Sequence, residues 1–306
     1  MTENAENSAL AAFRKKIDEI DDGIVRLLLE RIGVVTQVGE MKRKAGVGCP
    51  IRSGREARQL RRIIEQCENA GRKDVLLPAA ASAIWRIIIG LSTSVEMPLK
   101  LSAFTPIGDS DLFWLAREYF GPFVPVIRQP QIKRVIGDVM DGKAAVGILP
   151  VMRTTDASNW WLNLMEEGAD IPKIFARIPF VNTDTPGKDA PSGLAIARVM
   201  PEESGDDVSL WVIEADHNVS QNRLQGALTS AKLEAQWINV SALSQITRHH
   251  LIEIKGFVTP DDENMKSMLS GLGKAIVNVG FLGAYAVPVI LNASETKSSH
   301  AAASKT

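Results

Sequence analysis

Two cations, Arg31 and Lys42, stand in a stretch of sequence whose pattern otherwise predicts an apolar helix face. Positions taken in steps of three and four fall on one side of an α-helix, and all but these two are apolar: Leu10, Phe13, Ile17, Ile20, Ile24, Leu28, Arg31, Val35, Val38 and Lys42. An unpaired buried charge is expensive, so both cations need anionic partners. They lie roughly 16 Å apart along a helix, close enough for two long side chains to hold one small polyanion.

Three further polar residues occupy core positions of two other predicted helices. They are Glu56 on the second helix, and Ser92 and Glu96, one turn apart on the third. A buried salt-bridge network is the plainer interpretation, and Ser53 with Glu56 also forms the S-x-x-E pattern of a helix capping box. The capping box accounts for Ser53 fully and for the position of Glu56 in part. It accounts neither for the two cations nor for Ser92 and Glu96 on the third helix, so a pocket for a polyanion is the more specific alternative.

Arg14 lies at the edge of the same stripe but too far away to share a ligand with Arg31 in one chain. The two residues are roughly 25 Å apart along a helix. Arg14 could reach a ligand bound to a second copy if two long helices pair antiparallel. The spacing therefore predicts a dimer whose sites are shared between chains.

The elements that must position these residues are three helices. No proline interrupts residues 10–44, which predict one long helix, although Gly23, Gly33 and Gly39 lower its propensity. A second helix is expected from Ser53 to about Ala70, and a third ends near Glu96. Residues 1–9 are small and polar and are expected to be a disordered tail.

After Pro98 the pattern changes to alternating strands and helices. The expected fold is multidomain: an all-α three-helix domain over 10–97 that forms a dimeric helical bundle, a small α/β lobe over 98–200, and an α+β domain of β-α-β-β-α-β order over 206–292. A second disordered tail is expected over 293–306.

The composition is that of an ordinary globular protein and excludes several function classes. The chain has 306 residues, is 45% hydrophobic and has a net charge of −1, which gives no electrostatic case for nucleic acid. Two cysteines make neither a disulfide framework nor a cysteine-rich metal site. No signal peptide and no apolar run of membrane-spanning length is recognised, so a cytoplasmic protein with no membrane contact is expected.

Residues 10–97 resemble a known family, the chorismate mutases of the all-helical class. The resemblance lies in FRKKIDEIDDGIVRLLLERIGVVTQVGEMKRKAG, PIRSGREARQL and IWRIIIGLSTSVE. It implies that Arg14 is donated by the partner subunit and that the remaining substrate-binding positions are Arg31, Lys42, Arg55, Glu56, Ser92 and Glu96. The segment before the R-E pair is one residue shorter than in the family. Ser53 stands where the family often has an aspartate, so the contact to the substrate hydroxyl rests on Glu56.

The chemistry that this resemblance implies is the rearrangement of chorismate to prephenate, which needs no metal, cofactor or nucleophile. Arginines such as Arg31 would hold the two carboxylates in the reactive conformation. Lys42 and Glu96 would donate to the ether oxygen, where negative charge develops as its bond to carbon breaks. A carboxylate would repel that oxygen, so Glu96 must carry a proton to act there.

The C-terminal two thirds resemble prephenate dehydratase followed by an ACT regulatory domain, but incompletely. FTPIGDSDLFWLAREYFG and VIGDVMDGKAAVGILPV are similar to the dehydratase, whereas LIEIKGFV and VNVGFLGAYAVP are similar to the ACT domain. In the family the dehydratase cleft lies between two α/β lobes, whereas this chain has residues for only one, over about 98–180. Ser192-Gly193-Leu194 stand where the family has Thr-Arg-Phe, and Met152-Arg153-Thr154 stand where it has Glu-Asn-Ser. A degenerate dehydratase is therefore expected.

Two smaller motifs lie in the ACT-like segment. Gly226-Ala227-Leu228 is similar to the family's effector loop, and His249-His250 is interpreted as a surface pair rather than a metal site. The leading hypothesis is a homodimeric chorismate mutase of aromatic amino acid biosynthesis with an inactive dehydratase remnant. The alternatives are a bifunctional mutase and dehydratase, and a non-catalytic sensor or regulatory subunit for aromatic metabolites.

Overall fold

A computed structural model of the chain describes residues 2–46, 49–70, 76–153, 159–166, 168, 170–182, 191–242 and 244–291. The chain divides into two compact units, Met1–Pro50 with Leu91–Pro98, and Ile51–Gly90 with Leu99–Thr306. The first unit is helical, and the second combines helices with a sheet. The tail expected over 293–306 lies outside the described residues.

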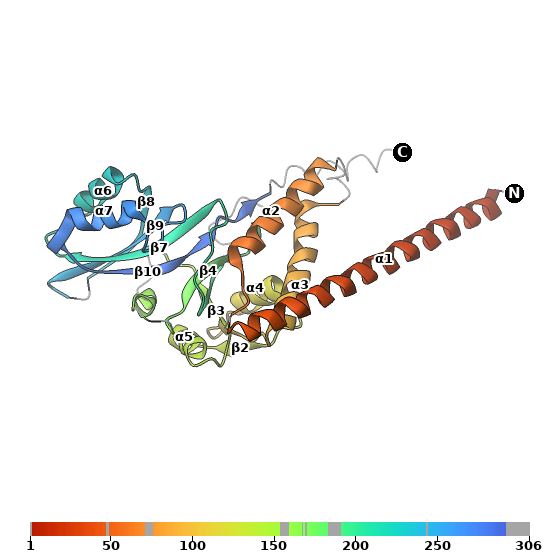
Figure 1. Cartoon of the computed structure of the whole chain (residues 1–306), viewed down its shortest axis with the longest axis horizontal. Coiled ribbons are helices and arrows are strands. Elements are labelled where there is room, and N and C mark those ends of the chain that lie inside the picture. Colours follow the sequence, from red (N-terminus) through yellow and green to blue (C-terminus); the bar gives the residue numbers. More distant parts are fainter. Residues whose placement is uncertain are drawn as a thin grey trace. The chain divides into compact units, whose positions relative to one another are not determined.

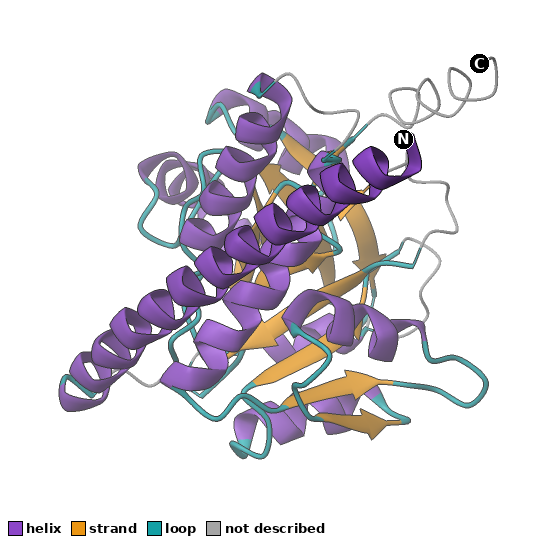
Figure 2. Cartoon of the chain, turned by 90° about the vertical axis from the view of Figure 1, so that its right-hand side faces the viewer, coloured by secondary structure: helices purple, strands orange, loops and turns teal. Residues whose placement is uncertain are grey.

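Most of the first unit is a single uninterrupted helix, α1 (Thr2–Lys44), which is the long helix predicted from the sequence (Figure 2). It begins at Thr2, so the disordered tail expected over 1–9 is wrong for the described residues. The segment TENAENSAL contains no proline or glycine that would stop the helix, and its alanines favour helix formation.

The apolar stripe of α1 forms as predicted, but its N-terminal half is not buried in the single chain. The following residues are at least half exposed: Leu10, Phe13, Ile17, Ile20 and Ile24. A monomeric soluble protein rarely shows so large a contiguous apolar face to water. This face therefore marks a surface that a further partner would cover.

The second and third helices are α2 (Ser53–Asn69) and α3 (Pro78–Glu96), close to their predicted bounds. α2 and the part of α3 up to Gly90 pack in the second unit, where Leu60, Ile89 and Phe180 belong to one apolar cluster. A Cβ atom at Gly90 would lie 2.0 Å from the carbonyl oxygen of Phe120, so a glycine is required where α3 meets the end of α4 (Asp111–Phe120).

Within the described residues, α3 is the one helix that is long and apolar enough to cross a membrane. Of that apolar stretch, 33% is buried within the structure. Arg86 lies in its middle, is 7% exposed, and pairs with Glu56 of α2. An internal ion pair of this kind belongs to a folded unit rather than to a lipid-facing helix.

The expected α/β lobe is present, and its elements follow the predicted order: β1 (Leu101–Phe104), α4, β2 (Val126–Gln129), α5 (Ile132–Met140), β3 (Val146–Pro150) and β6 (Gly193–Ala197). The sequence interpretation missed β4 (Lys173–Ile178), which lies between β6 and β10 in the sheet. It also missed the short elements: the 3₁₀ helix Trp160–Leu164, and the pair β5 (Val181–Asn182) and β11 (Val289–Ile290).

The predicted β-α-β-β-α-β segment is also present: β7 (Asp207–Asp216), α6 (Gln221–Ser230), β8 (Ala235–Ser241), β9 (Thr247–Lys255), α7 (Glu263–Leu272) and β10 (Ile276–Ala286). Figure 1 shows α6 and α7 together against these strands. The lobe and this segment share one nine-stranded sheet of order β2-β1-β3-β6-β4-β10-β7-β9-β8. The domain boundaries at 98–200 and 206–292 stay a prediction, since the sheet runs through both.

The core of the second unit lies on both faces of this sheet. One cluster includes Trp160 and Trp161, and the other lies under α6 and α7. His250 belongs to the interior and is only 2% exposed, so the interpretation of His249-His250 as a surface pair is wrong. The Trp237 indole nitrogen donates to Nδ1 of His250. Burial, with smaller contributions from Arg248 and His249, lowers the pKa of the His250 imidazole.

Acidification should therefore destabilise the protein through His250. As the pH falls below about 6.5, the unfolded chain binds a proton that the folded chain resists, because the folded-state pKa is the lower of the two. At about pH 8 and above both states are neutral and this residue contributes nothing. Urea-unfolding midpoints measured from pH 8 to pH 5 should fall less steeply in His250→Gln, which keeps an acceptor for Trp237. The exposed His217, changed to glutamine, serves as the control; equal slopes in all three proteins would contradict the assignment.

Candidate active site

Within the first unit, the last turn of α1 meets the end of α3 through Lys42 and Glu96. The Lys42 ammonium lies 2.5 Å from Oε2 of Glu96, and the two side chains are only 21% and 14% exposed. The Arg43 guanidinium donates to the backbone carbonyl of Glu96 at 3.1 Å, and Lys42 also donates to the carbonyl of Pro50 at 3.4 Å. Glu96 is thus held by both its carboxylate and its backbone.

A second contact of the same kind lies one turn earlier on α3. The Arg31 guanidinium donates to the hydroxyl oxygen of Ser92, which is buried. Arg31 and Lys42 therefore face α3, and the structure brings together four of the predicted site residues. Ser92 and Glu96 are thus the partners that the two cations on the apolar stripe of α1 need.

The two helices approach closely at Gly39, which lies between Arg31 and Lys42. A Cβ atom at Gly39 would lie 3.2 Å from Cα of Glu96 and 3.5 Å from its Cγ. By contrast, a Cβ atom at Gly33 would meet nothing within 4 Å. The glycine at 39 therefore lets the backbone of α3 come near enough for the short side chain of Ser92 to reach α1.

Arg14 is not brought to these residues in the single chain. It lies on the exposed N-terminal half of α1, roughly 25 Å from Arg31 along the helix. The role of Arg14 at a site shared between two chains stays a prediction.

The remaining predicted residues begin α2, in the second unit. Arg55 is exposed, whereas the Glu56 carboxylate accepts a hydrogen bond of 2.9 Å from Arg86 of α3. Sequence reasoning missed Arg86, although a single charge inside the apolar run AIWRIIIG was the available signal. Arg86 also donates to the carbonyl of Tyr119, and its guanidinium lies 3.6 Å from the centre of the Tyr119 ring.

Ser53 does not form the predicted capping box. It is the first residue of α2, whose N-cap is Arg52, and its hydroxyl oxygen accepts from the backbone N–H of Glu202 at 3.4 Å. The prediction was wrong because tertiary contacts occupy both residues of the motif: Ser53 meets the segment before β7, and Glu56 meets Arg86. Ser53 is therefore weaker as a substrate ligand than the sequence alone suggested.

In the α/β lobe, two of the residues that differ from the resembled family occupy structural positions. Gly193 begins β6 and pairs with both neighbouring strands, and Met152 is buried in the core. A shallow hollow of about 520 Å³ follows β1 and β2, and its lining includes Thr105, Asp109 and Arg128. This hollow lies at the carboxyl ends of parallel strands, a common place for ligands in α/β proteins.

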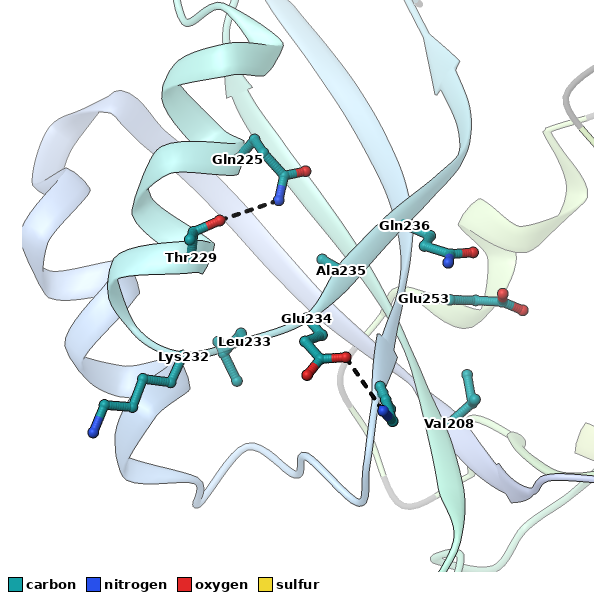
Figure 3. Close-up of a pocket in the computed structure, with 10 residues that line it drawn as sticks. Val208, Gln225, Thr229, Lys232, Leu233, Glu234, Ala235, Gln236 and Glu253 are labelled. Atoms are coloured by element: carbon teal, nitrogen blue, oxygen red, sulfur yellow. Dashed lines mark hydrogen bonds and ion pairs between the residues drawn. The ribbon is translucent and has the colours of Figure 1, made fainter.

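The ACT-like segment contains another hollow, of about 600 Å³, beside α6, β8 and β9 (Figure 3). Two pairs of its polar groups contact each other: Lys255 lies 3.4 Å from Glu234, and the amide of Gln225 donates to Thr229. Gly226-Ala227-Leu228 lies inside α6, and the resemblance of this motif to an effector loop stays a prediction. The period of buried leucines, Leu224 and Leu228, explains why the segment is helical there.

Comparison with known proteins supports the assignment of the helical part. Residues 13–97 match the family model of chorismate mutase type II, so this segment is a domain of that family. The bifunctional chorismate mutase/prephenate dehydratase of Aquifex aeolicus (strain VF5) is 30% identical over 159 residues, which are 52% of this chain and 43% of that protein. The protein of the same description from Neisseria gonorrhoeae (strain ATCC 700825 / FA 1090) is 30% identical over 149 residues, 49% of this chain and 39% of the other.

The chain thus matches less than half the length of these curated relatives. Among solved structures, the prephenate dehydratase of Streptococcus mutans is similar with a TM-score of 0.46 and 15% identity, covering 63% of this chain and 99% of that one. A structure described as GqqA, a novel type of quorum quenching acylases, has a TM-score of 0.44 and 13% identity, covering 61% of this chain and 95% of that one.

A larger residue at Gly39 should push α1 away from the end of α3 and weaken the contacts between them. We expect Gly39→Val to lower the free energy of unfolding by about 1–3 kcal/mol, because the added methyl groups meet the Glu96 backbone. Gly33→Val is the matched control and should be neutral or slightly stabilising, since valine has the better helix propensity and meets open space. Denaturant unfolding of both variants is the measurement, and equal effects would contradict a close approach at Gly39.

Proposed function

We propose that this protein is a chorismate mutase, an isomerase that rearranges chorismate to prephenate in the biosynthesis of phenylalanine and tyrosine. The observation that carries the proposal is the pair of contacts Arg31–Ser92 and Lys42–Glu96 inside a chorismate mutase type II domain. Chorismate has two carboxylates, and cations at a defined spacing are what its recognition requires. The names of the two curated relatives support the same activity.

The reaction is unimolecular, so the protein supplies orientation and charge rather than a nucleophile. Arg31, oriented by Ser92, would bind one carboxylate and hold the flexible side chain of the substrate over its ring. The 2.5 Å contact between Lys42 and Glu96 puts two polar groups within reach of one oxygen atom. As the ether bond breaks, the Lys42 ammonium stabilises the charge on that oxygen, and Glu96 donates to it in its protonated form.

The other proposed substrate ligands come from the resemblance. Arg55 would bind the second carboxylate, and Glu56 would accept from the ring hydroxyl. Ser53 is the least supported of the set, because its hydroxyl oxygen already accepts from the Glu202 backbone. No step requires a metal or cofactor.

The exposed stripe of α1 supports a homodimer. Apolar side chains from Leu10 to Ile24 are open to water in one chain, and a second copy running antiparallel would cover them with the same stripe. In that arrangement Arg14 of each chain would reach the substrate bound by the other. A cytoplasmic location follows from the proposed pathway.

The dehydratase-like lobe is proposed to be catalytically inactive, because a glycine in the central sheet replaces the side chain expected at 193. The alternative of a bifunctional mutase and dehydratase is favoured by the names of both curated relatives. A non-catalytic sensor is less well supported, because both curated relatives are described as enzymes.

Incubation with chorismate should yield prephenate without phenylpyruvate when both are quantified before any acid treatment. Lys42→Ala should lower kcat about 100-fold or more, because it removes a donor at the developing charge. Glu96→Gln is the matched variant that donates without needing a proton, and it should stay active where Glu96→Ala does not. Phenylpyruvate formation would establish the bifunctional alternative, and the absence of both products would favour the sensor.

Mixing two inactive variants should restore activity if Arg14 acts across a dimer. Arg14→Ala and Lys42→Ala each remove an essential residue from every site of their own homodimer. After subunit exchange, half of the dimers are mixed, and each mixed dimer contains one complete site out of two. About a quarter of the wild-type activity is therefore expected, by the two-fold symmetry of the pair. Recovery near zero, with exchange verified by mass spectrometry, would show that Arg14 acts within its own chain or not at all.

A further inference from the structure

A cavity of about 420 Å³ lies entirely within the second unit, among α2, α3, α4 and the end of β4. This volume is within the range of pockets that hold small organic molecules. Its walls are mostly apolar and include Leu60, Leu115, Phe180 and Val181. The polar groups that reach it are Ser82, Arg86, Glu118, Tyr119 and Asn182.

The α3 side of the cavity is one helix face of small residues that ends in an arginine. Ala79, Ser82, Ala83 and Arg86 follow one another in steps of three, one and three. The small side chains leave the space that a ligand would fill. Arg86 closes the inner end, where its guanidinium stacks on the Tyr119 ring.

Ser82 is the unexplained group of this cavity. Its side chain is 2% exposed, and its hydroxyl oxygen has no hydrogen-bond partner among the described residues. A buried hydroxyl without a partner is costly, and most such groups in proteins are satisfied. Because Ser82 lines the cavity, a ligand there could supply the missing hydrogen bond.

The charge at the inner end is already balanced. Arg86 is paired with Glu56 at 2.9 Å and donates to the Tyr119 carbonyl at 2.9 Å. An anionic ligand would therefore compete with Glu56, whereas an uncharged one would leave the ion pair intact. The chemistry that fits is a small aromatic body for the apolar walls with one hydroxyl or carbonyl group for Ser82.

We propose that this cavity is a second ligand site, for a small uncharged aromatic molecule with one hydrogen-bonding oxygen, and that its occupancy acts on Glu56 through Arg86. The second half of the proposal rests on the proposed function, in which Glu56 contacts the substrate. A ligand packed beside Arg86 excludes water from the Glu56–Arg86 pair, which strengthens that pair and fixes the carboxylate in one orientation. Coupling of this kind is reciprocal between the two ligands.

Binding is tested first, with the full chain and with no requirement for activity. Fluorine NMR titrations measure the dissociation constants of 4-fluorobenzyl alcohol and 4-fluorotoluene, which differ in one hydroxyl. Ala79→Leu fills the cavity and should abolish binding of both probes, whereas Ala80→Leu, on the exposed side of the same helix, should leave both unchanged. Ser82→Ala should weaken binding of the alcohol by roughly fivefold relative to binding of 4-fluorotoluene, because the alcohol loses one hydrogen bond.

The coupling is tested next. Saturating 4-fluorobenzyl alcohol should lower the KM for chorismate about fivefold, and chorismate should tighten binding of the alcohol by the same factor. Both effects should vanish in Ala79→Leu and persist in Ala80→Leu. Binding that is absent, or unchanged in Ala79→Leu, overturns the site. Binding without a change in KM overturns the link through Arg86, and binding by a protein without mutase activity overturns the proposed function while leaving the site in place.

Discussion

A charge placed on the apolar face of a helix has to be met by an opposite or hydrogen-bonding group, and the helical part of this protein depends on that constraint. α1 has Arg31 and Lys42 on the same face as its apolar stripe. On α3, Ser92 accepts a hydrogen bond from Arg31, and Glu96, one turn later, pairs with Lys42. Gly39 lets the two backbones approach so that these short contacts form. The residues that stabilise the pairing of α1 with α3 are thus the same ones that suit a small dianion.

The two halves of α1 differ in how far one chain buries them. Its C-terminal half finds partners at the end of α3, but its N-terminal half leaves Phe13, Ile17 and Ile24 open to water. Burial of such side chains is worth about 1.5–3 kcal/mol each. A surface of this size is therefore a strong driving force for association, and Arg14 lies within it, where a neighbouring chain could use it.

Local patterns in the sequence predicted the elements well and the tertiary contacts poorly. The 3.6-residue period located α1, and alternating strand and helix signals located the lobe and the β-α-β-β-α-β segment, because these depend on neighbours in sequence. β4 was missed although KIFARI is largely apolar. A strand this short shows no clear alternation of apolar and polar residues that would distinguish it from a loop. The capping box was wrong because a distant contact decided it. The Ser53 hydroxyl accepts from the backbone of Glu202 and makes no capping hydrogen bond in its own helix.

The contacts of Arg86 are the clearest example of what sequence reasoning could not predict, and they show what the α/β lobe contributes to the second unit. Its partners are Glu56 on α2 and Tyr119 on α4, which are separated by more than sixty residues and meet only in the folded second unit. α2 is further tied to that unit by Arg61, which donates to the carbonyls of Ser204, Asp206 and Val287. Removing the lobe would therefore expose Leu60 and Ile89 and leave two buried charges, Glu56 and Arg86, without their support. Through these contacts the lobe is part of the scaffold that holds Glu56, a proposed substrate ligand, in place.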